Sequence, residues 1–286
     1  MQAWQQDHLT IADCERLSPL EKLETRILLM YATRLSRIQL ITQSDYQLNT
    51  QQTRQFQDLV QRRLNGAPIA YLTGEREFFG LNFHTSPAVL IPRADTELLV
   101  DLALNYAPNN SALLDLGTGS GAIAIAIAHN RADLAVTAID ISEAALDIAQ
   151  KNVTRLLPPD RLHLLQSDWY SNVSGQVFQT IVSNPPYIVK DDPHLVQGDL
   201  RFEPINALTD HGDGLSAYRR IISDASHHLA QNGWLLMEHG YHQAADVRQL
   251  LSDHHFQNVQ TWCDLAGIER VSGGQICTDP IADKGA

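Results

Sequence analysis

The sequence predicts an α/β protein with a doubly wound, mostly parallel β-sheet, preceded by a small N-terminal helical domain. Three observations support this fold class. From residue 111 onward, short apolar runs alternate with longer segments of helical pattern, as in proteins built from βαβ units. An early apolar run leads directly into Gly117, Gly119 and Gly121. A later run stops at Pro185 and Pro186, which cannot continue a strand because proline lacks an N–H and fixes φ.

Residues 1 to about 65 are expected to be helical. Ser18 and Pro19 mark the start of one helix, since proline is favoured in a first turn. Residues 51–64 show the same periodicity, and Gly66 ends that helix. Helical spacing predicts that the apolar face of the first helix comprises Leu23, Ile27, Met30 and Tyr31. This module is either a lid that only stabilises the core or a docking surface for a protein substrate, and composition does not decide between them.

A β-hairpin is expected over residues 75–91, where aromatic residues surround Gly80 and a second strand covers residues 88–91. Asp95 is the expected N-cap of the helix that follows. The domain organisation expected from these patterns is a helical domain at residues 1–74, a linking hairpin at 75–92 and the α/β domain at 93–286.

The α/β domain is expected to alternate strands and helices, with one ambiguous segment. Residues 122–128 alternate like a strand, but every position is apolar and alanine favours helices. Because a glycine loop also needs a helix behind it, we predict a helix there. The other helices are expected at 142–156, 214–230 and 243–254. The strands are expected at 113–116, 134–139, 161–166, 177–183, 233–238, 256–263 and 268–277.

Composition excludes several classes of protein. The net charge is −12, which disfavours general nucleic-acid binding because phosphate contacts need Lys and Arg; a basic protein partner fits better. The three cysteines are an odd number without metal-ligand spacing, so reduced cytosolic thiols are expected and no metal is assigned. The N-terminus does not resemble a signal peptide. No apolar run reaches the roughly 18 residues of a membrane span, so a cytoplasmic protein is expected.

The glycine-rich segment, residues 117–121, predicts a ligand site at the end of the first strand. Glycine permits a tight turn and close approach of a ligand, although the spacing is not that of dinucleotide folds. The N-terminus of the next helix favours negative charge or polarised hydroxyls. Asp140 ends the second strand, where a carboxylate can accept hydrogen bonds from both hydroxyls of a ribose.

Asn184, Pro185, Pro186 and Tyr187 follow the fourth strand and form the most informative motif of the chain. The two prolines force a stiff, extended turn at the sheet edge where ligands bind in open α/β folds. There the Asn184 side-chain oxygen and the Pro185 carbonyl can both accept hydrogen bonds from one NH2 group, while Tyr187 stacks on the planar group that carries it. This arrangement suits an amide or amino nitrogen that acts as a nucleophile. The alternative is a rigid turn without chemistry.

The order of these parts resembles the class I S-adenosylmethionine-dependent methyltransferases, and the Asn-Pro-Pro-Tyr motif resembles the branch that methylates planar nitrogens. Further blocks narrow the resemblance to the peptide-chain release factor glutamine methyltransferases, known as PrmC or HemK. They lie at residues 68–74, 77–80, 90–97 and 201–204. The resemblance runs from about residue 20 to Val271. The chain departs from the pattern at Ala94, where the family has proline, and in the tail after Val271.

The resemblance implies a seven-stranded sheet whose last two strands pair antiparallel. It also implies methyl transfer from S-adenosyl-L-methionine to the side-chain nitrogen of the glutamine in the Gly-Gly-Gln motif of release factors, which supports translation termination. The catalytic residues expected from it are Asn184, Pro185 and Tyr187. The expected cofactor-binding residues are Gly117, Thr118, Gly119, Ser120, Gly121, Asp140, Asp168, Trp169 and Asn184. The expected substrate-binding residues are Asn184, Pro185, Pro186, Tyr187 and Arg93.

The sequence leaves two possible roles open for several of these residues. Trp169 is either beside the adenine or simply a core residue. Arg93 either orients the substrate or forms an ordinary surface salt bridge, and Glu203 either orders a loop over the glutamine or caps a turn. The tail contains residues 272–275, Ser-Gly-Gly-Gln, but glycines near a terminal strand explain it better than self-methylation does.

Three rival functions remain at the level of sequence. An adenine-amino DNA or RNA methyltransferase also uses Asn-Pro-Pro-Tyr, with a flipped base on the tyrosine; the acidic charge and the N-terminal family blocks argue against it. A non-catalytic protein can use the same fold, but neither the glycine loop nor Asn184 and Tyr187 are needed for packing. A nicotinamide-dependent oxidoreductase requires a different glycine spacing.

Overall fold

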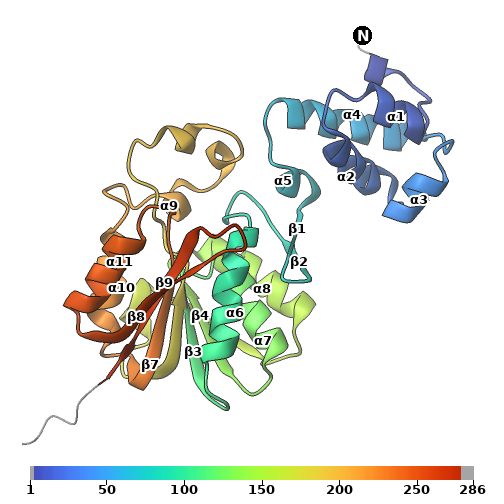
Figure 1. Cartoon of the computed structure of the whole chain (residues 1–286). Coiled ribbons are helices and arrows are strands. Elements are labelled where there is room, and N and C mark those ends of the chain that lie inside the picture. The colour runs from blue at the N-terminus through green and yellow to red at the C-terminus, as the bar shows by residue number, and fades with distance from the viewer. Residues whose placement is uncertain (1–2, 278–286) are drawn as a thin grey trace, which may run out of the picture. The chain divides into compact units, whose positions relative to one another are not determined.

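The computed structural model describes residues 3–277 and divides into two compact units, Met1–Glu75 and Arg76–Ala286 (Figure 1). The first unit is helical. Its helices are η1 (Ala3–Gln5), α1 (Ile11–Leu17), α2 (Lys22–Thr33), α3 (Arg37–Thr42), α4 (Thr50–Leu64) and α5 (Ile69–Thr73). Thr10, Ser36 and Asn49 each close a capping box at the start of a helix, which satisfies N–H groups that otherwise lack partners.

Two expectations for the first unit differ from the structure. Ser18 does not start a helix; it is the C-cap of α1, and α2 starts at Lys22. The buried face of α2 contains Leu28 and Leu29, whereas Leu23 is 69% exposed. Met30 and Tyr31 of the predicted face are partly buried against the core that Leu28 and Leu29 form with residues of α4, so this expectation was wrong only in part.

The second unit begins with a tight hairpin, β1 (Glu75–Phe78) and β2 (Leu81–His84). Phe79 and Gly80 both have positive φ, 52° and 75°, as a two-residue type I′ turn requires. This turn pairs β1 with the residues directly after it, so the expected strand at 88–91 was wrong. Buried Asn152 ties the hairpin to the sheet domain: it accepts from the N–H of His84 at 2.7 Å and donates to the carbonyl of Ser120 at 2.9 Å.

The sheet has seven strands in the order β5-β4-β3-β6-β7-β9-β8. They are β3 (Ala112–Leu116), β4 (Ala135–Asp140), β5 (Leu162–Gln166), β6 (Phe178–Ser183), β7 (Leu229–Glu238), β8 (Phe256–Cys263) and β9 (Glu269–Ile276). All neighbours are parallel except β7 with β9 and β8 with β9. The strand order reverses between β3 and β6, which creates a crevice at the carboxyl ends of these strands. The predicted fold class is confirmed.

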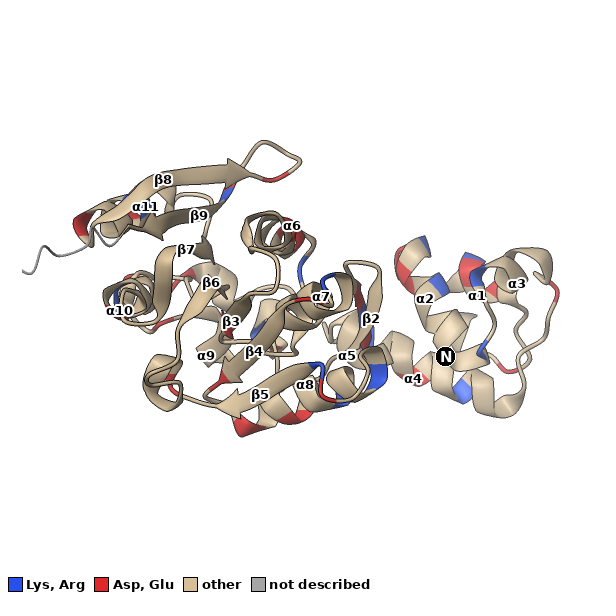
Figure 2. Ribbon diagram, turned by 90° about the horizontal axis from the view of Figure 1, so that it is seen from below, with Lys and Arg blue, Asp and Glu red and all other residues tan. Residues whose placement is uncertain are grey.

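Helices cover both faces of the sheet (Figure 2). α6 (Glu97–Tyr106), α7 (Ala122–Asn130) and α8 (Glu143–Leu156) lie on one face, and α10 (Ser216–Ala225) and α11 (Ala244–Asp253) lie on the other. The ambiguous apolar segment is a helix, α7, with residues 122–128 all buried. It alternates isoleucine and alanine because it is enclosed by the sheet, α6 and α8 and therefore has no solvent face to mark a helical period.

Several boundaries differ from expectation. The helix expected over 214–230 ends at Ala225, because β7 begins at Leu229. Asp95 lies in a 3-10 turn, η2 (Ala94–Thr96), and is not an N-cap; its carboxylate pairs with Arg270 at 3.1 Å. The sequence did not indicate four short elements, one before β6 and three between β6 and α10. They are η3 (Trp169–Asn172), before β6, and η4 (Pro193–Val196), η5 (Leu200–Phe202) and α9 (Ile205–Leu208), after it.

The Gly-Gly-Gln tripeptide of the tail is an interior part of β9. Gly273 pairs with Leu236 of β7 and with Gln260 of β8. A Cβ on Gly273 would lie 2.5 Å from the carbonyl oxygen of Leu235, so glycine is required by close packing of the strands. The Gln275 amide donates to the carbonyl of Asn232 at 3.1 Å. Glycines of a terminal strand therefore explain the tripeptide, and a reachable self-methylation target does not.

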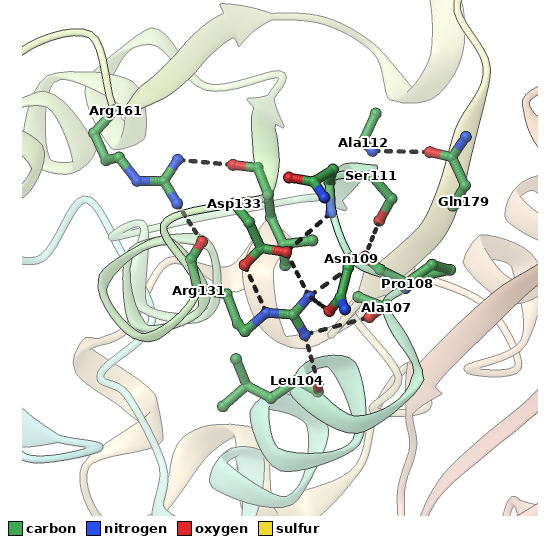
Figure 3. Close-up of polar contacts among 12 residues, drawn as sticks. Leu104, Ala107, Pro108, Asn109, Ser111, Ala112, Arg131, Asp133, Arg161 and Gln179 are labelled. Carbon is green, nitrogen blue, oxygen red and sulfur yellow. Dashed lines mark hydrogen bonds and ion pairs between the residues drawn. The ribbon is translucent and has the colours of Figure 1, made fainter.

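Arg131, directly after α7, joins three segments through polar contacts (Figure 3). Its guanidinium donates to the carbonyls of Leu104 at 3.0 Å and Ala107 at 3.3 Å, at the end of α6. It also forms a two-point ion pair with Asp133 at 2.7 and 2.8 Å, and Asp133 accepts from the N–H of Asn110 at 3.0 Å. The side chain thus caps the C-terminus of α6 and fixes the turn that leads into β3.

We expect Arg131→Ala to lower the free energy of unfolding by about 2 kcal/mol or more, because several hydrogen bonds to one charged group are lost together. Urea denaturation followed by circular dichroism measures this change. The matched control is Arg219→Ala, whose ion pair with Asp213 is about half exposed on both sides and should be worth less than 1 kcal/mol, roughly the median for surface pairs. Equal effects of the two substitutions would contradict the proposed capping role.

Within residues 3–277, none of the helices combines the length and apolar character that crossing a bilayer requires.

Candidate active site

A pocket of about 330 Å³ lies at the carboxyl ends of the central strands. Its walls come from the glycine loop after β3, from the ends of β4 and β5, from the turn after β6, and from residues 88–96. The sequence-predicted residues that line it are Arg93, Gly117, Thr118, Gly119, Ser120, Asp140, Asp168, Trp169, Asn184, Pro185 and Pro186. Gly121 and Tyr187, which were also predicted for the site, do not line it.

The glycine loop owes its shape to backbone conformations that side chains disfavour. Gly117 and Gly119 have φ of 73° and 56°, in the left-handed region that glycine adopts readily. The N–H groups of Gly117 and Thr118 both donate to the carbonyl of Ile139, at 2.9 and 2.8 Å. Gly121 also has a positive φ, 82°, and in addition a Cβ there would lie 2.8 Å from the Ile125 side chain of α7. Its predicted role in cofactor binding stays a prediction.

Asp140 holds the loop and still presents acceptors to the pocket. Its Oδ2 accepts from the N–H of Gly119 at 2.8 Å, and its Oδ1 accepts from the N–H of Ser142 at 2.9 Å. Burial raises the pKa of this carboxyl, while backbone hydrogen bonds from Ser142, Gly119 and Ile141 oppose that shift. A carboxylate has about four lone-pair sites, so these backbone contacts leave acceptor capacity for a ligand hydroxyl.

Asp168 and Trp169 also line this pocket. The Trp169 ring passes 3.9 Å from the position of a Cβ on Gly117, so it packs over the glycine loop and also joins the core on that side of the sheet. The Asp168 carboxylate forms an ion pair with Arg220 at 2.8 Å. Both partners of this pair are nearly half exposed, and such a pair adds little stability, so it leaves Asp168 available to a ligand.

The last residue of β6, directly before the turn, is hydrogen-bonded to the neighbouring strand. The Ser183 hydroxyl donates to the carbonyl of Leu116 at 2.8 Å, which ties β6 to β3. The Asn184 side-chain NH2 donates to the Thr96 hydroxyl at 3.2 Å. Tyr187 packs toward Gly240 instead of the pocket; burial raises the pKa of its phenol, and the nearby Glu238 carboxylate raises it further. The stacking role predicted for Tyr187 thus needs the ring to turn from this position.

Gln243 fixes this turn from behind. Its side-chain NH2 donates to the carbonyls of Tyr187 at 3.0 Å and Gly214 at 3.1 Å, and its oxygen accepts from the N–H of Gly240 at 2.9 Å. Gln243 is buried, and Gly214 (φ 77°) lies so close that a Cβ there would be 2.4 Å from the Tyr187 carbonyl oxygen. One buried amide therefore joins the turn after β6 to the segments before α10 and α11.

Gln243→Glu should destabilise the protein, because it replaces the two donated hydrogen bonds by a buried carboxylate facing two carbonyl oxygens. We expect a loss of about 2–3 kcal/mol in the free energy of unfolding, measured by urea denaturation. Gln150→Glu, the same change at an exposed position of α8, serves as the control. A similar stability for the two variants would show that Gln243 does not clamp the turn.

Arg93 lines the pocket, but its guanidinium is already paired with a carboxylate. Its guanidinium forms an ion pair with Glu203, whose side chain is fully buried. The second oxygen of Glu203 accepts from the N–H of Ile91 at 3.0 Å. Burial raises the pKa of Glu203, and the charge of Arg93 lowers it. Glu203 thus fastens the segment 200–204 to the segment 91–93, and the salt-bridge alternative for Arg93 is the one seen, with a buried partner.

Several lining residues were missed by the sequence reasoning. They are Phe78, Ala88, Val89, Leu90, Pro92, Thr96, Ala122, Ile123, Ile139, Ile141, Ser142, Ala145, Ser167, Pro204, Asn206 and Ala207. Most are apolar or small, and no local pattern distinguishes such residues from ordinary core or loop positions. Five of them are different, since they belong to the blocks on which the family resemblance rests: Phe78, Leu90, Pro92, Thr96 and Pro204.

The residues present fit S-adenosylmethionine. The glycine loop offers a cradle without side chains, Asp140 offers acceptors for a pair of ribose hydroxyls, and Trp169 offers an apolar surface for a flat base. Apolar lining with a few polar groups, in a volume of this order, is typical of small-molecule sites.

Comparison with known proteins shows the same architecture and sequence pattern. Residues 10–74 match the family model "PrmC N-terminal domain", and residues 91–201 match "Methyltransferase small domain". A release factor glutamine methyltransferase of Burkholderia pseudomallei is 51% identical over 93% of this chain and 96% of that protein. One from Escherichia coli is 44% identical over 88% of this chain and 91% of that protein.

A solved methyltransferase structure from Pyrococcus furiosus covers 75% of this chain and 95% of its own, with a TM-score of 0.53 and 18% identity; this likeness concerns the fold alone. The identities above, which extend over almost the full length of the relatives, carry the assignment. The chain belongs to the family of release factor glutamine methyltransferases.

Proposed function

We propose that this chain methylates the side-chain amide nitrogen of the glutamine in the Gly-Gly-Gln motif of peptide-chain release factors, and thereby supports translation termination. The methyl donor of this family is S-adenosyl-L-methionine, and the enzyme is a protein-glutamine N-methyltransferase. The observation that carries the proposal is the position of Asn184 and Pro185 in the wall of the pocket that also contains the glycine loop and Asp140.

The chemical difficulty is the weak nucleophile. An amide nitrogen shares its lone pair with the carbonyl group, so it attacks poorly. The Asn184 side-chain oxygen and the Pro185 carbonyl accept hydrogen bonds from the two hydrogens of the substrate NH2, which directs the lone pair away from them. Holding the nitrogen in place makes the step nearly unimolecular, and fixed dipoles stabilise the positive charge that develops on it. The bound cofactor supplies the electrophilic methyl group. The proton leaves late, to water.

The remaining roles follow from the pocket walls. Residues 117–120 line the methionine and ribose portions of the cofactor, and Asp140 takes the ribose hydroxyls. Asp168 accepts from the adenine amino group, and Trp169 packs beside the ring. Pro186 contacts the substrate amide plane, and Tyr187 does so after its ring turns from the position that it has in the structure. Arg93 helps to orient the substrate indirectly, because its ion pair with Glu203 holds residues 200–204 against residues 91–93.

The helical residues 1–74 are proposed to dock the protein substrate, and residues 93–286 to carry out the transfer, with the hairpin between them as the link. The acidic net charge of −12 suits a basic protein surface. A release factor as substrate places the enzyme in the cytoplasm, and no direct contact with nucleic acid is required for the reaction.

The test is methyl transfer from labelled S-adenosylmethionine to a purified release factor, beside a Gly-Gly-Ala version of it and duplex DNA. Label on the Gly-Gly-Gln protein alone is the expected result, and it identifies the substrate class and the target residue together. Label on DNA would instead support the adenine-amino rival. Equal label on the Gly-Gly-Ala protein would exclude the glutamine as the acceptor.

A further inference from the structure

The side-chain amide of Asn184 has two ends with opposite hydrogen-bonding properties, and only the oxygen end can accept from a substrate NH2. The rotation of this amide therefore decides whether the pocket presents an acceptor or a donor. Asparagine does not control this rotation by itself, because the oxygen and the NH2 group have nearly the same size. Something in the protein must distinguish the two ends.

The groups behind Asn184 supply this distinction. The Asn184 NH2 donates to the Thr96 hydroxyl at 3.2 Å. The carboxyl of Glu238 lies beside them, since β6 and β7 pair up to Ser183 and Met237, and both Thr96 and Asn184 lower its pKa. Thr96 is 5% exposed, and Glu238, the last residue of β7, is 2% exposed. A carboxylate can only accept, so it attracts the NH2 end of the amide.

We propose that Thr96 and Glu238 are positioning residues that set the rotation of the Asn184 amide, with the NH2 end inward and the oxygen toward the target nitrogen. This inference rests on the proposed function for its catalytic consequence, but not for its geometry. Neither residue contacts the reacting atoms in this scheme. They act through Asn184.

The surroundings of Glu238 bring its pKa into a range where the charge of its carboxyl changes with pH. Burial raises its pKa to about 7, and Asp95 raises it while Arg270 lowers it. The phenols of Tyr187 and Tyr218 also face it, and the Tyr218 hydroxyl donates to the backbone carbonyl of Glu238 at 2.8 Å. Among the described residues, the Oε2 atom has no hydrogen-bond partner, which agrees with a carboxyl that takes up a proton easily.

The sign of the pH effect follows. The ionised carboxyl predominates above a pH of about 7 and holds the amide by accepting. Below that pH the carboxyl gains a proton and becomes a donor as well, so it no longer selects the NH2 end. Turnover should therefore fall as the pH falls through about 7.

The first experiment compares Thr96→Val with Thr96→Ser. Valine has the same shape without the hydroxyl, whereas serine keeps it. We expect Thr96→Val to lower kcat about tenfold, the equivalent of one hydrogen bond, with the KM for S-adenosylmethionine unchanged. Thr96→Ser should restore most of the turnover. If both variants keep the wild-type kcat and differ only in melting temperature, Thr96 is merely structural and the inference fails.

The second experiment tests Glu238 by its pH profile. In the wild type, kcat should rise to a plateau with a midpoint near pH 7, and Glu238→Gln should lack this rising limb. An independent readout is the side-chain NH2 resonance of Asn184 in a nitrogen-15 spectrum, identified by its loss in Asn184→Ala. It should titrate in the wild type and not in Glu238→Gln.

The spectrum separates this inference from the proposed function, since it requires no substrate. A titrating resonance in a wild type that labels no release factor would uphold the positioning of Asn184 and reject the proposed substrate. A resonance that does not titrate, or that titrates equally in Glu238→Gln, would overturn the role of Glu238.

Discussion

Asn184→Ala is expected to lower kcat for glutamine methylation by about 10²- to 10³-fold, the effect of losing about 3 kcal/mol or more of transition-state stabilisation. The reason is that the Asn184 oxygen accepts a hydrogen bond that strengthens as positive charge develops on the attacked nitrogen. Binding of S-adenosylmethionine should change little, because the glycine loop and Asp140 remain. Two measurements on the same preparation separate the effect on catalysis from the effect on cofactor binding. They are the turnover with labelled cofactor and the cofactor affinity from calorimetry.

The control for this substitution is Asn130→Ala. Asn130 is exposed at the end of α7, where its amide donates to the carbonyl of Ala126 at 2.9 Å. It lies at the sheet edge away from the pocket, so its replacement should leave kcat unchanged. A wild-type kcat for Asn184→Ala would contradict the mechanism directly, whereas a parallel loss in both variants would point to a general effect on folding.

Asp140→Ala should weaken binding of S-adenosylmethionine by about 100-fold or more, since hydrogen bonds to a charged group contribute about 1.5–3 kcal/mol each. Two losses combine at this residue. The carboxylate no longer accepts from the ribose hydroxyls, and the N–H groups of Gly119 and Ser142 lose the acceptor that shapes the loop. Because burial raises the pKa of Asp140, the affinity should also fall in acid sooner than for an exposed aspartate.

Isothermal titration calorimetry provides this measurement. Asp140→Asn, which keeps one acceptor oxygen, should fall between the wild type and the alanine variant. Asp147→Ala, at an exposed position of α8, removes the same charge elsewhere and should bind as the wild type does. An affinity of Asp140→Ala equal to that of Asp147→Ala would exclude Asp140 from the cofactor site.

The sheet was predictable from the sequence because each of its strands is a short apolar run set between turn signals. The errors occurred where two solutions satisfy the same local pattern. Apolar residues occur on more than one side of α2, and packing against α4 decides which of them are buried most deeply. Residues 88–91 have strand-like composition, but the type I′ turn at Phe79 and Gly80 gives β1 a nearer partner. Asp95 has the right residue type for an N-cap, yet Arg270 engages its carboxylate.

The site was predictable to the same extent and for a similar reason. The motifs that supply it are contiguous in the chain, so the glycine loop, Asp140 and Asn184 could be recognised locally and stand in one pocket. The residues that hold those motifs come from distant segments: Thr96 behind Asn184, Gln243 behind Tyr187 and Glu203 beside Arg93. Such pairings are created by the topology of the sheet, and a single sequence contains no signal for them.

The Gly-Gly-Gln tripeptide inside β9 bears on how selective such an enzyme is among the proteins of a cell. The same three residues that identify its target are present in the enzyme itself, with the backbone between β7 and β8 and the Gln275 amide bonded to Asn232. In that state the backbone of the tripeptide is paired with strands on both sides. The Gly-Gly-Gln sequence alone is therefore not sufficient to define a substrate. The acceptor glutamine must lie on a segment whose backbone is not paired in a sheet. The backbone conformation of a Gly-Gly-Gln segment thus restricts which proteins the enzyme can methylate.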